Sequence, residues 1–202
     1  MARIKPKRHG VVTDMTAMCD VTFLLLTFFI MTTQFKKPDV EQIKPPSSIS
    51  EKLLPDASLM TINATTDGKF YFQPVENPSE RVELLDKMGQ KYGVTFDNNQ
   101  KAAFQKLPAV GVPMNQLKSF LDLPEDEQKN YKNPAGVPMD SINKQLTDWV
   151  QQSLSVNPSY KLAVKGDVNT QYPRIKSLFE GLRDIKFLNF WLITSQETKP
   201  VE

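Results

Sequence analysis

Cysteine and histidine are almost absent from the sequence, because Cys19 and His9 are the only examples among its 202 residues. A lone cysteine excludes an intrachain disulfide and a cysteine cluster for a metal. The chain also lacks a glycine-rich phosphate loop and a Gly-x-Ser-x-Gly nucleophile motif. We therefore expect no enzyme activity and no metal or organic cofactor.

Beyond the N-terminus the chain has no excess of positive charge. Four basic residues lie within positions 3–8, so a formal net charge of +2 leaves about −2 for the rest of the chain. That balance provides no basic face for nucleic acid. No acid precedes Asp14, so the positive-inside rule predicts a cytoplasmic N-terminus and a remainder that crosses the membrane. Lys36 and Lys37 weaken this argument without reversing it.

The most prominent feature present is an apolar stretch from Met15 to Thr33 with one charge, Asp20. About 19 residues at 1.5 Å each span about 28 Å, which matches the hydrocarbon core of a bilayer. The stretch is too long for a signal peptide and ends without a small-x-small cleavage site. We predict a cytoplasmic tail at 1–13 and a retained transmembrane helix at 14–34.

Asp20 makes this helix expensive to insert. A carboxylate near the bilayer centre costs roughly 3 kcal/mol, whereas each large apolar residue returns only about 0.3 to 0.6 kcal/mol. A simple anchor would do better with Leu at this position. We therefore predict that Asp20 faces protein or water and takes up and releases a proton there. The alternative is a buried polar contact that only specifies helix packing.

Three threonines share the face of the predicted helix that carries Asp20. At 100° per residue, Thr13, Thr16, Asp20 and Thr27 fall within an arc of about 60°. Hydroxyls on either side of the acid could hydrogen-bond its protonated form or hold a water beside it. Alternatively, the threonines bond to carbonyls of their own helix, which is common in membranes. The candidate proton-carrying residues are thus Asp20, Thr16 and Thr27.

The arrangement of a basic tail, one span opening with Thr-x-x-x-Asp-Val, a proline-rich linker and a small domain resembles the ExbD/TolR family of biopolymer-transport proteins. The family pattern around its membrane aspartate is Val-Thr-Pro-hydrophobic-x-Asp-Val, and Met15–Val21 is similar to it. The match gives Asp20 the proton-carrying position and Thr16 the family's threonine. Ala17 stands where the family usually has proline, and Asp14 where it usually has asparagine.

A second resemblance competes for the proton-carrying role. Residues 14–18, Asp-Met-Thr-Ala-Met, also look like the opening of the flagellar stator subunit MotB, in which Asp14 would carry the proton. Asp20 would then be an unexplained second charge, and the chain is short for the peptidoglycan-binding domain of MotB. Asp14 therefore remains a second candidate beside Asp20.

The ExbD/TolR resemblance implies a proton-channel and motor subunit of the bacterial inner membrane, with its C-terminal domain in the periplasm and protons as the coupling ion. Such a complex energises TonB-dependent outer-membrane transport. The implied partners are a multi-span ring like ExbB or TolQ, a second copy of the chain, and a transducer like TonB or TolA. The alternative is a membrane-tethered module that binds cell wall or protein, with Asp20 used only for assembly.

Residues 35–57 are polar and contain four prolines, which predicts an extended linker. Its segment 39–45 is similar to the short post-membrane strand of the family. If that strand pairs with a second copy or a partner by β-augmentation, Val40 and Ile43 are the candidate partner-binding residues. The alternative is a plain spacer.

Residues 58–202 predict an α/β (α+β) extracytoplasmic domain with a small sheet covered by helices. Leu59–Ala64 alternates like a strand, Asp67-Gly68 signals a hairpin turn, and Lys69–Phe72 returns as the second strand. Near the C-terminus, segments 160–165 and 187–194 have strand patterns on either side of a helical pattern. They predict a βαβ unit.

The helical pattern of that unit covers positions 172–185. Asp167 follows the first strand at a place where the family often has an acid, and a helix-entry cap is the simpler explanation. A further amphipathic helix is predicted over Ile142–Leu154, begun by Pro138 and Asp140.

Between the hairpin and this helix, residues 76–135 form an insertion that the family normally lacks. Apolar residues recur at helical spacing within it, so we expect helices. Gly-Val-Pro-Met occurs at 111–114 and again at 136–139, which predicts two similar helix starts with proline near the first turn. A lineage-specific decoration and a dedicated partner-binding surface are both compatible with the pattern.

Overall fold

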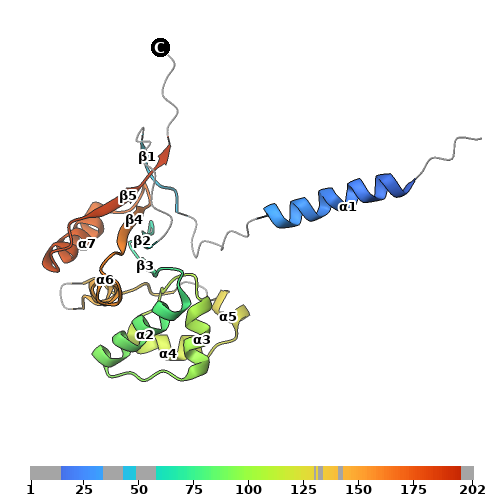
Figure 1. Cartoon of the computed structure of the whole chain (residues 1–202). Helices are drawn as coiled ribbons and strands as arrows, with labels where there is room; N and C mark the ends of the chain where they lie inside the picture. The colour runs from blue at the N-terminus through green and yellow to red at the C-terminus, as the bar shows by residue number, and fades with distance from the viewer. Residues whose placement is uncertain are drawn as a thin grey trace, which may run out of the picture. The chain divides into compact units, whose positions relative to one another are not determined.

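The computed structural model describes residues 15–33, 43–48, 58–129, 131, 134–140 and 143–196. The chain divides into two compact units, residues 1–37 and 38–202. Among the described residues, the first unit holds the single helix α1 (Met15–Thr32), and the second is a mixed α/β domain (Figure 1). This arrangement confirms the predicted fold class.

The domain is built on a four-stranded sheet with the order β3-β2-β4-β5. Its strands are β2 (Leu59–Ala64), β3 (Phe70–Gln73), β4 (Lys161–Gly166) and β5 (Phe190–Ile193). Strands β2 and β3 pair in antiparallel fashion through a turn in which Gly68 has a φ of 73°, which glycine adopts without strain. The other two pairs are parallel. The predicted hairpin and βαβ unit are thus both present.

Helices α6 (Gln145–Val156) and α7 (Tyr172–Asp184) complete the part of the domain that the family resemblance predicted. Alternate residues of the strands form the core, so Met60, Ile62 and Leu162 are completely buried. On α7, Leu178 and Leu182 are buried, while Phe179 stacks on Phe190 of β5 with ring centroids 5.0 Å apart.

The insertion is helical, as predicted. It consists of α2 (Pro78–Tyr92), α3 (Asn98–Lys106), α4 (Met114–Leu121) and α5 (Glu125–Lys129). Asn77 caps the start of α2 by accepting from the Ser79 N–H, and Gly93 ends it in the left-handed conformation.

The insertion shares the core of the sheet. The indole of Trp149 on α6 stacks between Phe72 of β3 and Phe104 of α3, with centroid distances of 5.9 Å on each side. All three side chains are at most 1 % exposed. Helices α2, α3 and α4 of the insertion are therefore an integral part of one hydrophobic core.

Both Gly-Val-Pro-Met segments lie near the outer edge of β3. Val110, just before the first, bridges to Phe72, and Val137 of the second donates its N–H to the Phe70 carbonyl. The two segments are joined by the Gly136 N–H, which donates to the Gly111 carbonyl. The insertion thus covers an edge of the sheet that would otherwise be open to strand pairing.

Only the first Gly-Val-Pro-Met segment starts a helix directly. Pro113 is the N-cap of α4, whereas α6 begins at Gln145, with Lys144 as its N-cap. The start predicted at Pro138 and Asp140 is wrong, because the Asp140 N–H donates to the Asn143 carbonyl in a turn before the helix. Ile142, predicted to open this helix, lies outside the described residues.

Candidate functional site

Helix α1 has the length and composition of a membrane span. Its 18 residues have a mean hydropathy of 1.8, and none of them is buried within the protein. At 1.5 Å per residue the helix is about 27 Å long. Large apolar side chains such as Phe23 and Phe28 are more than 60 % exposed. A surface of this kind requires lipid or another protein around it.

Asp20 is the single charged residue of α1 and lies in its second turn. Thr16 is one turn before it and Thr27 two turns after it, on the same face, as the sequence predicted. The Asp20 side chain is exposed. The helix thus presents its one carboxylate outward, to whatever surrounds it.

The hydroxyls of Thr22, Thr27 and Thr32 in α1 bond to carbonyls of their own helix. Thr27 donates to the Leu24 carbonyl at 2.9 Å, and Thr22 donates to the Met18 carbonyl at 2.8 Å. The only hydroxyl proton of Thr27 is therefore used locally, as in the second of the two sequence-based alternatives. Thr27 still offers the Asp20 face an acceptor oxygen.

Two of the other sequence candidates, Asp14 and Val40, lie outside the described residues. Ile43 is half-buried in the linker, next to Lys44. A short strand, β1 (Ser47–Ser48), follows and pairs in parallel with β6 (Ser195–Gln196) of the same chain. Residues 47–48 therefore pair with the chain's own domain, and pairing of segment 39–45 with a second copy or a partner stays a prediction.

Lys44 is joined to the loop after β4 by two backbone groups. Its N–H donates to Oδ2 of Asp167 at 2.9 Å, and its carbonyl accepts from the Val168 N–H at 3.0 Å. The other carboxylate oxygen, Oδ1, accepts from the Asn169 N–H at 2.9 Å. The N–H groups of Asn169 and Lys44 hold the pKa of the Asp167 carboxyl below its usual range.

Asp167 is not a helix cap, contrary to the simpler sequence interpretation. The N-cap of α7 is Gln171, and no side chain caps that helix. Asp167 instead forms a turn with Asn169 and binds the linker, a contact 123 residues distant in sequence. Two sequence signals pointed to Asp167, its place directly after a strand and the acid that the resembled family often has there, but neither indicated a contact with the linker.

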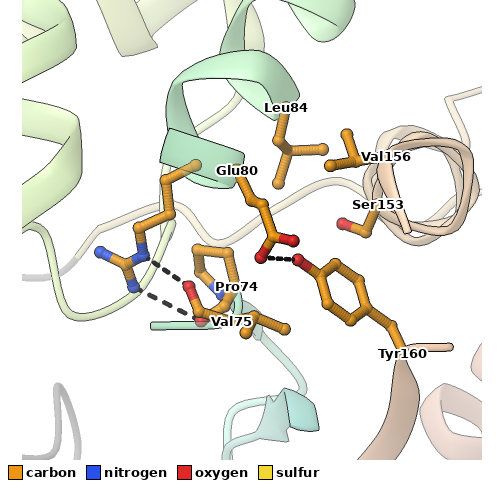
Figure 2. Close-up of a pocket in the computed structure, with 8 residues that line it drawn as sticks. Pro74, Val75, Glu80, Leu84, Ser153, Val156 and Tyr160 are labelled. Carbon is orange, nitrogen blue, oxygen red and sulfur yellow. Dashed lines mark hydrogen bonds between the residues drawn. The ribbon is translucent and has the colours of Figure 1, made fainter. Parts of the chain in front are cut away.

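A shallow hollow lies where α2 meets α6 and the start of β4 (Figure 2). Figure 2 shows Glu80 and Tyr160 pointing toward each other across it, and the Tyr160 hydroxyl donates to the Glu80 carboxylate. Burial and this hydrogen bond raise the pKa of Tyr160. The hydrogen bond between Tyr160 and Glu80 joins the insertion to the sheet. Because the two groups are already bonded to each other, the hollow presents few polar groups that could bind a ligand.

Arg81, the next residue on α2, binds backbone carbonyls. Its guanidinium donates to the carbonyls of Val75, Gln105 and Leu107 at 2.7 to 2.9 Å. Burial lowers the pKa of Arg81, and the charge of Glu76 opposes that shift. Arg81 thus joins the start of the insertion to the end of α3. Within the described ranges, no three His, Cys, Asp or Glu side chains gather as metal ligands.

Comparison with known proteins gives one match that covers nearly the whole chain. The family model described as "Biopolymer transport protein ExbD/TolR" matches residues 6–197, which include α1, the linker, the insertion and the sheet. No curated protein and no solved structure matches the chain at a significant level.

Proposed function

This chain belongs to the ExbD/TolR family of biopolymer-transport proteins, and we propose that it is the proton-carrying motor subunit of its complex. The family and the candidate span indicate an inner-membrane protein with a TonB- or Tol-type role in energy transduction. In the proposal, Asp20 takes up a proton from one side of the membrane and releases it to the other.

The single observation that carries this proposal is the exposed carboxylate of Asp20 on an otherwise uncharged apolar helix. Its insertion cost of roughly 3 kcal/mol would be pointless in a simple anchor. Protonation discharges the acid, so the helix can move within an apolar channel, and deprotonation resets it. Each charge that crosses 100 mV supplies about 2.3 kcal/mol, which suffices for a small conformational step.

The same reasoning defines the surroundings of α1. The carboxylate needs protein or water beside it, which a multi-span ring like ExbB or TolQ supplies around two copies of the helix. Family membership implies partners of the ExbB/TolQ and TonB/TolA types. We place the N-terminus in the cytoplasm and the α/β domain in the periplasm, where it passes motion to the transducer. Protons are the only coupling ion in this scheme, and the chain performs no enzymatic step.

The decisive experiment is the Asp20→Asn substitution in the full chain, expressed with its ring partner in cells that depend on it. We expect normal levels and normal co-purification with the ring, but loss of proton-driven uptake through a TonB-dependent transporter. Cys19→Ser, one residue away, removes no carboxylate and should leave uptake unchanged. Normal uptake by Asp20→Asn would overturn the proposal, and normal uptake by Asp14→Asn as well would favour the tethered binding module.

Asp14→Asn separates the two candidate acids. If Asp20 carries the proton, Asp14→Asn keeps most of the uptake. If uptake is lost with Asp14→Asn and kept with Asp20→Asn, the stator-like assignment of the proton to Asp14 is correct.

A further inference from the structure

The linker enters the domain well before the first strand of the main sheet. Lys44 is bonded to Asp167 and Val168, directly after β4, and β1 is paired with β6, directly after β5. Residues 44–48 therefore lie beside the ends of the two parallel strands that α7 connects. Force arriving along the chain from α1 meets these contacts before it reaches β2 at Leu59.

The turn at residues 167–170, which holds Lys44, is itself held in place by hydrogen bonds. The Asp167 N–H donates to the Ala64 carbonyl at the end of β2, and the Thr170 hydroxyl donates to the neighbouring Thr65 carbonyl. The Thr170 N–H closes the turn onto the Asp167 carbonyl at 3.0 Å. The carboxylate of Asp167 is thus presented to the linker by a turn attached to two strands of the sheet.

We propose that Asp167 is a positioning residue that latches the linker onto the domain, so that motion of α1 is delivered at Lys44 and not at the start of β2. This inference rests on the proposed function for its purpose, but the latch itself is defined by the contacts of Lys44. It also makes Asp167 a functional residue outside the membrane helix.

The latch determines how far the domain can move from the membrane. From Thr33 to Lys44 the chain reaches at most about 40 Å when fully extended, whereas from Thr33 to Ser58 it reaches about 90 Å. A closed latch therefore leaves a short connecting segment between α1 and the domain, which transmits a small displacement of α1. Opening the Lys44 contacts moves the first anchor to Ser47 in β1 and adds about 10 Å of slack, and release of β1 from β6 raises the slack to about 50 Å, which absorbs the displacement.

The chemistry of the latch requires both oxygens of the carboxylate. Oδ1 serves the turn at Asn169 and Oδ2 serves Lys44. In Asp167→Asn the amide can keep its oxygen on the Asn169 N–H, but it then turns an NH2 donor toward the Lys44 N–H. The substitution therefore removes one of the two hydrogen bonds that hold Lys44 and weakens the latch, while it preserves the turn.

Hydrogen exchange on the full chain in detergent tests the latch directly. The reporters are the amides of Ser47, Ser48 and Val168. We expect Asp167→Asn to accelerate their exchange about three- to tenfold, the effect of losing one exposed charge-assisted hydrogen bond. Lys44→Pro removes the donor and should do the same. Amide exchange in the double variant should be no faster than in either single variant, because both substitutions remove the same hydrogen bond, between Lys44 and Asp167.

Asp184→Asn is the matched control. Asp184 is another exposed acid, and it lies at the end of α7. Its hydrogen bond from Lys144 lowers the pKa of its carboxyl, and none of the hydrogen bonds that hold Lys44 involves Asp184. It should leave the three reporters unchanged. The latch is disproved if Asp167→Asn changes their exchange by less than twofold. Equal acceleration of the amides in β2 would also disprove it, because Asp167 would then only stabilise the fold.

Transport measurements test what the latch does. Asp167→Asn and Lys44→Pro should each lower proton-driven uptake severalfold at normal assembly, and Asp184→Asn should not. Full uptake despite accelerated exchange would overturn the delivery of motion at Lys44. Failure of the motor proposal itself appears elsewhere, as normal uptake by Asp20→Asn, and leaves the exchange result untouched.

Discussion

Helix α1 and the α/β domain differ in how they shield their apolar side chains from water. In the domain, Trp149, Phe72 and Leu146 are completely buried by neighbours in the same chain. In α1, Phe23, Phe28 and Ile30 are all more than 60 % exposed. The domain therefore buries its apolar side chains within itself, whereas the apolar surface of α1 requires lipid or another protein around it. The part that is complete by itself is the scaffold, and the incomplete part carries the proposed proton step.

Polar groups show the same contrast. Arg81 in the domain is 3 % exposed, and its guanidinium donates to backbone carbonyls of the same domain, which stabilise its charge. Asp20 in α1 is exposed. An acid whose partners come from another molecule can change those partners during a cycle, and a buried, fully bonded guanidinium cannot.

The largest expected effect on the domain comes from Trp149→Ala. Loss of the ring stacked between Phe72 and Phe104 leaves a cavity where the sheet, α6 and the insertion meet, at a cost of about 3–5 kcal/mol. Urea unfolding of the full chain in detergent, followed by circular dichroism, measures it. Trp149→Phe keeps an aromatic ring and should cost less. Asp20→Leu should not shift the transition at all, and a shift would show that the two regions are coupled.

Arg81→Met is expected to have the next largest effect. Methionine keeps much of the volume but leaves the carbonyls of Val75, Gln105 and Leu107 without their donor, at a cost of about 2–4 kcal/mol. Urea unfolding gives the total, and hydrogen exchange should be fastest at the end of α3. Arg174→Met, at a half-exposed arginine, is the matched control and should cost less than 0.5 kcal/mol. Equal costs for the two variants would show that the carbonyl contacts contribute nothing.

The smallest effect is expected from Tyr160→Phe, about 1 kcal/mol at neutral pH for one hydrogen bond. Burial and the bond to Glu80 raise the pKa of Tyr160, so the folded domain keeps a proton that the unfolded chain loses above about pH 10. Stability should therefore fall as the pH rises beyond that value, and it should fall less steeply in Tyr160→Phe.

The control for this alkaline effect is Tyr172→Phe, because Tyr172 is 74 % exposed. Its unfolding curve should follow that of the unaltered chain at every pH. Tyr92, whose hydroxyl donates to Asp148, has a pKa raised by the same two causes and should behave like Tyr160. An identical pH dependence in Tyr160→Phe and the unaltered chain would show that this contact does not control the titration.

Much of the fold could be predicted because it depends on local patterns. Alternation over Leu59–Ala64 and the Asp67-Gly68 turn specify the hairpin before any distant residue is considered. The start of α6 could not be predicted, because Pro138 and Asp140 carry helix-start signals that a turn uses instead. Helix boundaries depend on which competing hydrogen bond the tertiary structure favours.

The candidate membrane helix and its one acid can be identified from the sequence, because length, hydropathy and the cost of a charge are properties of a short stretch. The folded domain was needed to find that the insertion shares the core through Trp149 and that Asp167 holds the linker. These contacts join residues dozens to more than a hundred positions apart. Their partners are chosen by the packing of the whole domain, which no local pattern encodes.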